Sequence, residues 1–345
     1  QENQTMKLMI TEEAVGQVLC HDITQIIRGV TKDAVFRKGH VITEEDIPVL
    51  LSVGKDNIYV WENDESMMHE NDAAEVLCSI CKGDNMSRGG VKEGKIELAA
   101  ECDGVLKINR EKLDAVNSFG QMMIATRHGD FPVKKGDKLA GTRIIPLVIG
   151  KEKMQKVQQL CGEEPIMKVV PYIPRKAGIV VTGNEILYGR IKDDFTPVVI
   201  DKLKEFGCEV EGHKMTGDDS TNIEKGIKEF IEAGCDLILC TGGMSVDPDD
   251  RTPLAIRNVC GVPVTYGAPV LPGAMFMLAY YGANKIPVIG LPGCVMYAKR
   301  TIFDLVLPRI MTGEILEKND FDKLGEGGLC LNCSICTFPN CGFGK

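Results

Sequence analysis

From about residue 165 onward, the apolar and polar positions follow two alternating patterns. Continuous apolar runs at 177–183, 235–243 and 285–293 predict buried strands, and residues 208–215 predict another strand. Buried strands joined by crossover helices form a parallel sheet with helices on both faces, so residues 165–312 are predicted to form a three-layer α/β domain with a mostly parallel sheet. Apolar residues at helical spacing predict its helices at 197–207, 220–234, 252–261 and 294–311.

The residues that precede this domain show more mixed patterns. Residues 6–62 combine strand-like runs with helix openings of the type Thr-Glu-Glu and predict a small α+β module. The acidic stretch 63–71 predicts a linker, and residues 72–150 predict a helix followed by short strands, that is, a small β-rich accessory module. Neither module shows a catalytic constellation, so we expect both to have structural or substrate-covering roles. A cysteine-rich tail, 313–345, ends the chain.

Composition narrows the class of protein. The chain has 345 residues, of which 44% are hydrophobic and 26% charged, as in ordinary folded proteins of two or three domains. Its net charge of −9 argues against a general nucleic-acid binder, which would carry a basic face. No apolar run approaches the roughly 18 residues that a membrane span needs, and no signal peptide is visible. We therefore expect a cytoplasmic protein that binds neither nucleic acid nor membrane.

Three of the predicted strands end in a glycine turn. In an open parallel sheet, ligands bind beyond the carboxyl ends of the strands, where glycine lets the backbone approach a ligand and lets amide groups point at an anion. Neither the P-loop nor the dinucleotide-binding glycine pattern is present, which disfavours an ordinary kinase or dehydrogenase. The turns therefore predict a different ligand site. They are Thr182-Gly183-Asn184-Glu185, Thr241-Gly242-Gly243-Met244-Ser245 and Leu291-Pro292-Gly293-Cys294.

Acidic residues are dense near these turns. Asp250 stands just before Thr252-Pro253, where a helix is predicted to begin with Thr252 as its N-cap. A carboxylate beside phosphate-binding glycines is the usual place for Mg²⁺, which neutralises a phosphate while keeping several waters. For neighbouring acids such as Asp193 and Asp247, a solvated acidic face is the alternative interpretation.

These residues make the segment resemble the molybdopterin-binding domain family of molybdopterin adenylyltransferases, molybdopterin molybdotransferases and gephyrin-related proteins. Thr241–Val246 is similar to the family sequence Ser-Gly-Gly-Val-Ser-Val, and Asp250–Pro253 to the adenylyltransferase Asp-Val-Thr-Pro. Thr182–Glu185 is similar to the molybdotransferase Thr-Gly-Asp-Glu. Over about 140 residues the resemblance also includes Gly189-Arg190-Ile191, Asp218-Asp219 and Leu291-Pro292-Gly293.

The resemblance implies molybdenum-cofactor biosynthesis, in which molybdate enters adenylylated molybdopterin and AMP is released. Asp250, Asp219 and Glu185 would then be catalytic, and Asp250 and Asp219 would hold Mg²⁺. The implied partners are molybdopterin or its adenylylated form, molybdoenzymes or other cofactor-maturation proteins, and a second copy in a homo-oligomer. The implied cofactor-binding residues are Thr182, Gly183, Asn184, Thr241, Gly242, Gly243, Ser245, Thr252, Pro272, Gly273, Pro292 and Gly293.

Two other functions remain open at this point. The Asp-x-Thr-Pro stretch at Asp250 points equally well to the adenylyl-transfer step of the same pathway. A third interpretation is a non-catalytic carrier or sensor of molybdopterin or of the molybdenum cofactor. It is favoured by Ala274 and Met275, which stand where molybdotransferases usually have Lys-Pro, so that a basic group is missing.

The tail concentrates four thiols at Cys330, Cys333, Cys336 and Cys341. In a reduced compartment disulfides are disfavoured, and thiolates three residues apart can share one tetrahedral metal ion or one face of a cluster. The first three follow the ligand spacing of a bacterial ferredoxin and the fourth is displaced by one residue, so Zn²⁺ and an iron–sulfur cluster are both compatible. Because the predicted closing helix ends before Gly313, we expect the α/β domain to fold without residues 330–345.

Overall fold

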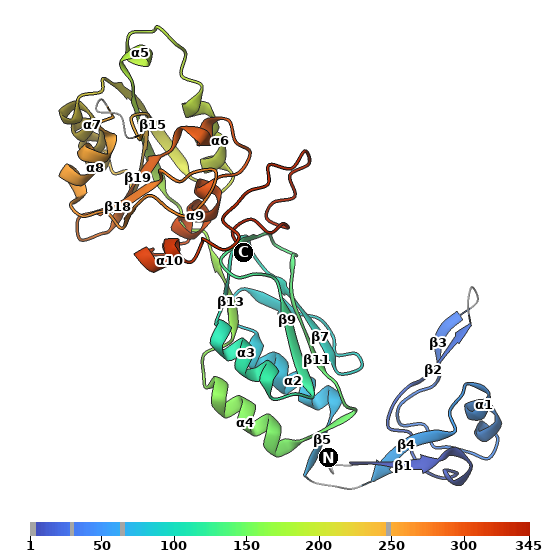
Figure 1. Cartoon of the computed structure of the whole chain (residues 1–345). Coiled ribbons are helices and arrows are strands. Elements are labelled where there is room, and N and C mark those ends of the chain that lie inside the picture. The colour runs from blue at the N-terminus through green and yellow to red at the C-terminus, as the bar shows by residue number, and fades with distance from the viewer. Residues whose placement is uncertain (1–4, 28–30, 63–65, 246–249) are drawn as a thin grey trace. The chain divides into compact units, whose positions relative to one another are not determined.

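The computed structural model divides the chain into two compact units, which Figure 1 shows with their elements labelled. It describes residues 5–27, 31–62, 66–245 and 250–345. Unit 1 comprises residues 1–101, 108–127 and 136–168, and unit 2 comprises residues 102–107, 128–135 and 169–345. Within the described ranges, no helix is long and apolar enough to cross a membrane.

The first part of unit 1 is built from antiparallel strand pairs around a small apolar core that includes Leu19, Leu50 and Ile58. Its elements are β1 (Thr5–Ile10) paired with β4 (Asn57–Glu62), β2 (Ile23–Ile27) paired with β3 (Thr31–Phe36), the 3₁₀ turn η1 (Thr11–Glu13) and α1 (Asp46–Ser52).

The rest of unit 1 is an antiparallel sheet accompanied by three helices. The sheet has the strand order β6-β7-β11-β9, with β6 (Met86–Arg88), β7 (Lys95–Ala100), β11 (Lys138–Ile144) and β9 (Met122–Thr126). The helices are α2 (Glu70–Cys81), α3 (Arg110–Ser118) and α4 (Lys151–Cys161). A separate pair joins β5 (Met67–His69) to β12 (Val148–Gly150).

Unit 2 is organised by a six-stranded sheet with the order β15-β14-β16-β19-β18-β17. The first four strands in this order run parallel, β18 runs antiparallel to β19, and β17 runs antiparallel to β18. The predicted mostly parallel sheet is confirmed, although the apolar pattern did not reveal the antiparallel pair. The strands are β14 (Lys176–Thr182), β15 (Glu209–Thr216), β16 (Leu237–Thr241), β17 (Thr265–Tyr266), β18 (Met277–Tyr281) and β19 (Ile286–Leu291).

Helices cover both faces of this sheet because successive side chains of each buried strand point to opposite sides. Ile179 of β14 packs into one apolar cluster with α6 (Phe195–Lys204) and α9 (Ile302–Met311). The next residue, Val180, packs into a second cluster with α7 (Ser220–Glu232) and α8 (Thr252–Cys260). The three-layer α/β architecture is therefore confirmed. Two short helices complete the layers, α5 (Asn184–Leu187) and α10 (Lys318–Asp322).

Two local predictions are wrong. The helix expected over 294–311 begins only at Ile302, because Thr301 and Asp304 form a capping box in which the Phe303 amide donates to the Thr301 hydroxyl. Before it, residues 293–296 form the 3₁₀ turn η2 (Gly293–Met296). The N-cap of α8 is Arg251 and not Thr252, because the Thr252 hydroxyl donates instead to the Gly242 carbonyl at 2.8 Å.

The cysteine-rich tail is not a separate appendage. Phe343 is only 4% exposed and belongs to the same apolar cluster as α9. The Cys330 amide donates to the Leu271 carbonyl at 2.8 Å, and the Gly344 amide donates to the Gly327 carbonyl at 2.8 Å. This packing contradicts the premise that the domain is complete without residues 330–345.

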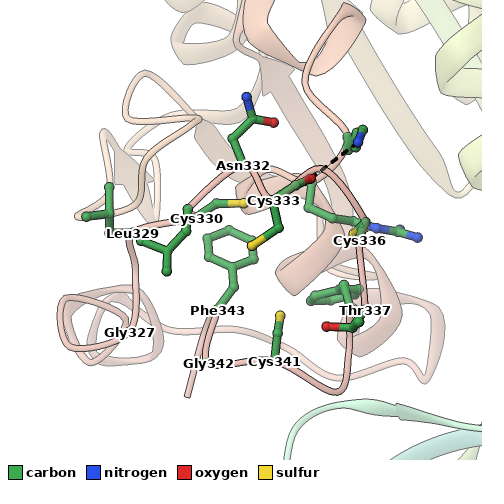
Figure 2. A pocket seen from close by; sticks show the side chains of 14 residues that line it. Gly327, Leu329, Cys330, Asn332, Cys333, Cys336, Thr337, Cys341, Gly342 and Phe343 are labelled. Atoms are coloured by element: carbon green, nitrogen blue, oxygen red, sulfur yellow. Dashed lines mark hydrogen bonds between the residues drawn. The ribbon is translucent and has the colours of Figure 1, made fainter.

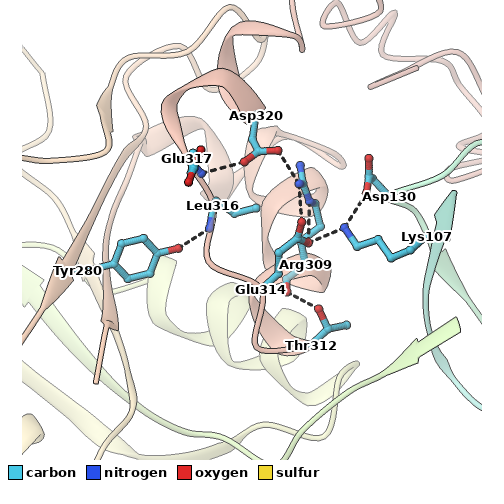
Figure 3. Close-up of polar contacts among 9 residues, drawn as sticks. All are labelled: Lys107, Asp130, Tyr280, Arg309, Thr312, Glu314, Leu316, Glu317 and Asp320. Carbon is cyan, nitrogen blue, oxygen red and sulfur yellow. Dashed lines mark hydrogen bonds and ion pairs between the residues drawn. The ribbon is translucent and has the colours of Figure 1, made fainter. Parts of the chain in front are cut away.

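A charged network fixes the end of α9 within unit 2 (Figure 3). Arg309 donates to Glu314 and to Asp320, each at 2.7 Å. Lys107, on β8 (Gly104–Ile108), donates to Glu314 and to Asp130, each at 2.6 Å. The network thus ties α9 and α10 to a three-stranded sheet that consists of β10 (Pro132–Val133), β8 and β13 (Met167–Pro171).

This network predicts that acid weakens unit 2. Burial alone would raise the pKa of Glu314, but the hydrogen bonds and charges of Arg309 and Lys107 outweigh it and hold that pKa below its usual value. A depressed carboxylate pKa adds stability above the unfolded-state value of about 4.3, and this stability is lost as the pH falls through the folded-state pKa. Glu314→Gln should therefore cost roughly 2 kcal/mol at neutral pH, the scale of a hydrogen bond to a charged group.

The measurement is urea unfolding followed by circular dichroism at several pH values. The difference between wild type and Glu314→Gln should shrink towards zero at a pH well below about 4. Glu232→Gln, at an exposed position on α7, is the control and should stay within about 0.5 kcal/mol of wild type. A difference that does not change with pH would contradict the role assigned to the Glu314 carboxylate.

Candidate functional site

A hollow of about 540 Å³ lies at the carboxyl ends of β16 and β19. Three chain segments line it together with Asp250. They follow β16, precede β18 and follow β19, and each contains a glycine that the sequence analysis named as cofactor-binding: Gly242 and Gly243, Gly273, and Gly293. The lining residues are Gly242, Gly243, Met244, Ser245, Asp250, Gly273, Ala274, Met275, Leu291, Pro292, Gly293, Cys294, Met296 and Tyr297.

Close contact between two strand ends sets the first of these turns. Gly242 has φ +83°, and a Cβ there would clash with the Thr182 carbonyl at the end of β14. Thr182 donates its hydroxyl to the Thr241 carbonyl at 3.1 Å, while Thr252 donates to the Gly242 carbonyl. Thr182 and Thr252 are both buried, so they position the turn and are not part of the lining of the hollow.

Thr241, the last residue of β16, carries an unsatisfied polar group. Its side chain is 1% exposed, and its hydroxyl has no hydrogen-bond partner within the described residues. A buried hydroxyl without a partner costs free energy, about 1–3 kcal/mol, and such groups occur where a ligand or water completes them. The next residue, Gly242, lines the hollow.

Asp250 is the single carboxylate among the lining residues that the structure describes. It is half-buried, and no hydrogen bond or ion pair engages its carboxylate within the described part of the chain. No described lining residue is Lys or Arg. Burial raises the pKa of the Cys294 thiol, so this thiol stays protonated at neutral pH. Among the described lining residues, the fixed side-chain charge is therefore the negative charge of Asp250, next to the N-terminus of α8; residues 246–249, which include Asp247, lie outside the described residues.

Other predicted site residues lie away from this hollow, around the ends of β14 and β15. Glu185 is an exposed residue of α5, and Gly183 is the N-cap of that helix. The Asn184 amide donates to Asp218 at 3.1 Å. Asp219 caps α7 by accepting from the Thr221 amide at 2.9 Å. The structure thus brings together Asp250 and the glycines at positions 242, 273 and 293. Glu185, Asn184 and Asp219 are not part of the lining. Their catalytic, metal and cofactor roles stay predictions.

Two lining residues, Met296 and Tyr297, were not named in any part of the sequence analysis. They fall in the segment expected to be the first turns of the closing helix, whereas the structure has η2 and a loop there. Tyr297 is 77% exposed and presents an aromatic ring at the mouth of the hollow. The available signal was Thr301-x-x-Asp304, a capping pattern that marks a helix start at residue 302.

Comparison with known proteins shows to which family the α/β domain of unit 2 is similar. Residues 178–312 match the family model described as a probable molybdopterin binding domain. This segment belongs to the molybdopterin-binding domain family. Outside it, residues 9–62 match the model of a domain of unknown function.

Among curated relatives, a CinA-like protein of Mycobacterium tuberculosis is 37% identical over 89 residues, which are 26% of this chain and 21% of the relative. A CinA-like protein of Mycobacterium avium is 36% identical over 98 residues, which are 28% of this chain and 23% of the relative. The chain therefore spans less than a quarter of the length of these relatives.

Two solved structures are also similar to part of this chain. The molybdopterin biosynthesis enzyme MoaB of Thermus thermophilus is 24% identical to it, and the match includes 41% of this chain and 98% of the MoaB chain, with a TM-score of 0.35. The protein CinA of Thermoplasma acidophilum is 20% identical and covers 35% and 89%, with a TM-score of 0.30. The fold assignment accordingly rests on the strand order and the family match of the molybdopterin-binding domain.

A second hollow of about 280 Å³ lies beside the molybdopterin-binding domain and is lined by all four tail cysteines (Figure 2). The described cysteines are all free thiols. Within the part of the chain that the structure describes, no three His, Cys, Asp or Glu side chains form a group that could hold one metal ion. The tail metal therefore stays a prediction at this stage.

The glycines of the molybdopterin-binding domain predict a contrast in stability. Gly242→Ala places a methyl group against the Thr182 carbonyl at a positive φ, and should destabilise unit 2 by about 2 kcal/mol or more. Gly293→Ala should change the free energy of unfolding by less than about 0.5 kcal/mol, because its added methyl group meets no atom within 4 Å. Urea unfolding of both variants tests this. Equal stability of the two variants would show that the close contact at Gly242 is not a constraint.

Proposed function

We propose that the chain binds molybdopterin in the hollow at the ends of β16 and β19 and acts in molybdenum-cofactor maturation. The proposed step inserts molybdate into adenylylated molybdopterin and releases AMP. The observation that carries the proposal is the convergence of three glycine turns and Asp250 on one hollow within a domain of the molybdopterin-binding family. The receivers of the product would be molybdoenzymes or other cofactor-maturation proteins.

The lining suits a flat heterocycle attached to a phosphate. Its volume of about 540 Å³ lies in the usual range for small-molecule sites, roughly 300–1,000 Å³. Met244, Met296 and Tyr297 offer apolar and aromatic surfaces for a ring system. The backbone of the glycine turns offers amide and carbonyl groups without side chains in the way, and the N-terminus of α8 favours a phosphate.

Asp250 fits the role of a magnesium ligand. Mg²⁺ in phosphate sites is usually bound through one or two carboxylates together with substrate phosphates, and Asp250 is the carboxylate that the hollow presents. When bound, Mg²⁺ would neutralise charge on the phosphoanhydride. Asp219 is engaged as the cap of α7 and lies outside the lining, so the proposal rests on Asp250 and not on the pair.

The rival function is a carrier or sensor without turnover. It is favoured by the lack of any Lys or Arg among the lining residues, where Ala274 and Met275 stand in place of the family's Lys-Pro. Without a cationic side chain, anionic groups of the substrate rely on backbone amides, the α8 N-terminus and the proposed cation. Adenylyl transfer, the other enzymatic alternative, would use the same hollow, and the product released distinguishes the three functions.

Binding in this hollow predicts a specific effect of Gly293→Ala. The added methyl group points into open space in the free protein and occupies room that a closely bound ligand would need. The affinity for molybdopterin should fall about tenfold or more, which corresponds to about 1.4 kcal/mol. Gly212→Ala, on β15, is the matched control because its methyl group also meets no atom within 4 Å. Anaerobic titration with molybdopterin measures both variants, and equal affinities would remove the case for this hollow.

The chemistry predicts a larger effect of Asp250→Asn. This change keeps the shape of the side chain but removes the charge that would hold Mg²⁺, a loss worth several kcal/mol at the transition state. Magnesium-dependent release of AMP from adenylylated molybdopterin and molybdate should fall by about a hundredfold or more, since each ~1.4 kcal/mol is a factor of ten. Much of the molybdopterin affinity should remain.

The assay includes two comparisons. Glu232→Gln removes an exposed carboxylate of α7 and should leave turnover unchanged. Wild-type protein is also supplied with ATP and molybdopterin, and release of pyrophosphate there would establish adenylyl transfer instead. Wild-type protein that binds molybdopterin but turns over neither substrate pair is a carrier. An Asp250→Asn protein as active as wild type would show that Asp250 is structural.

A further inference from the structure

The tail hollow gathers four thiols that are spread over twelve residues of sequence. Cys330, Cys333, Cys336 and Cys341 all line it, and Figure 2 shows their side chains around one space with the ring of Phe343 among them. Cys333 and Cys336 are exposed, and Cys330 and Cys341 are half-buried. A tail without a ligand has no evident reason to direct four thiols to one apolar hollow.

The size of this hollow argues against a single ion. Four sulfurs bound to one tetrahedral Zn²⁺ at about 2.3 Å would lie roughly 3.8 Å from each other. No group of three or more metal-ligating side chains that could hold one ion exists in the described part of the chain. Instead, the cysteines stand around a space of about 280 Å³. That arrangement suits a ligand with its own bulk that meets each thiolate separately.

The spacing of the first three cysteines points to the same kind of ligand. In the bacterial ferredoxin run C-x₂-C-x₂-C-x₃-C, the first three cysteines ligate one cubane cluster and the fourth ligates the other cluster. The distance in sequence to the fourth cysteine is therefore not fixed by the cluster that the first three share. Here Cys330, Cys333 and Cys336 have that spacing, and the fold places Cys341 on the same hollow.

The remaining walls provide apolar cover and positive charge. Leu329, Phe338 and Phe343 line the hollow and give it apolar walls. Arg300, which donates to Asp304 at 2.9 Å, also lines the hollow and lies over the Phe338 ring, 4.9 Å from its centroid. Lys299 donates to the carbonyls of Cys333 and Ser334, at 3.3 and 2.9 Å, and so holds the loop between two thiols. A cluster ligated by four thiolates is anionic, so these two cations complement it.

We propose that this hollow binds a [4Fe–4S] cluster through Cys330, Cys333, Cys336 and Cys341. The site is independent of the molybdopterin hollow, so its failure or success leaves the proposed function untouched. Two ferrous and two ferric ions supplied from solution combine with four sulfides to give a [4Fe–4S]²⁺ core with no net oxidation or reduction, and the four cysteine sulfurs bind it as thiolates, their protons passing to solvent.

The test uses the full chain purified without oxygen and reconstituted anaerobically with equal amounts of ferrous and ferric iron and with sulfide. About four irons and four inorganic sulfides should bind per chain, with the broad visible absorption of thiolate-to-iron charge transfer. Reduction with dithionite should produce the electron paramagnetic resonance signal of a reduced cubane. A brown protein with about two irons and two sulfides per chain would overturn the cubane assignment.

Cysteine-to-serine variants test which thiols bind the cluster. Cys333→Ser and Cys336→Ser change exposed side chains and should each reduce bound iron by at least half without changing the circular dichroism spectrum. Cys260→Ser, at the end of α8 and outside the hollow, is the matched control and should bind iron as wild type does. Equal iron binding by the tail variants and the control would overturn the proposal. So would tight stoichiometric zinc in place of iron, or disulfides among the four thiols in anaerobic protein.

Discussion

The close approach of two strand ends controls the geometry of the candidate site. Gly242, after β16, lies against the Thr182 carbonyl, after β14, with no room for a side chain between them. The buried hydroxyls of Thr182 and Thr252 hold this contact with hydrogen bonds that cross from one segment to the next. Because Thr252 opens α8, the same contact also places the helix N-terminus and, two residues earlier, Asp250. Backbone packing therefore determines where the charge of the hollow lies.

The parallel core could be predicted from sequence because its strands are buried on both faces and appear as uninterrupted apolar runs, such as 177–183. The antiparallel edge could not, since β17 has only two residues and the apolar run of β18 does not show in which direction the strand runs. The start of α9 was misplaced because apolar spacing continues through residues 294–301, and only the Thr301–Asp304 capping pair marks the true boundary.

The site was predictable to the extent that glycine turns reveal strand ends. The order of the strands in the sheet could not be predicted from the sequence, and this order decides which turns lie next to each other. In the sheet β16 and β19 are neighbours, whereas β15 is two places away from β16. This is why Gly243, Asp250 and Gly293 share a hollow while Asp219 does not. The tail's aromatic residues, such as Phe343, follow no helical or strand period, so their burial in the α/β core had no sequence signal.

The two hollows have no lining residue in common, but short segments of the chain lead from one to the other. The segment 291–297 contributes to the hollow at the ends of β16 and β19. Lys299 and Arg300, which line the tail hollow, come just after this segment in the chain. Leu271, which exchanges backbone hydrogen bonds with Gly328 and Cys330 of the tail, is followed by Pro272 and by Gly273 of the molybdopterin hollow. Any effect that a ligand in one hollow has on binding in the other therefore obeys thermodynamic linkage. By whatever factor a ligand in the tail changes the affinity for the pterin, the pterin changes the affinity for that ligand by the same factor.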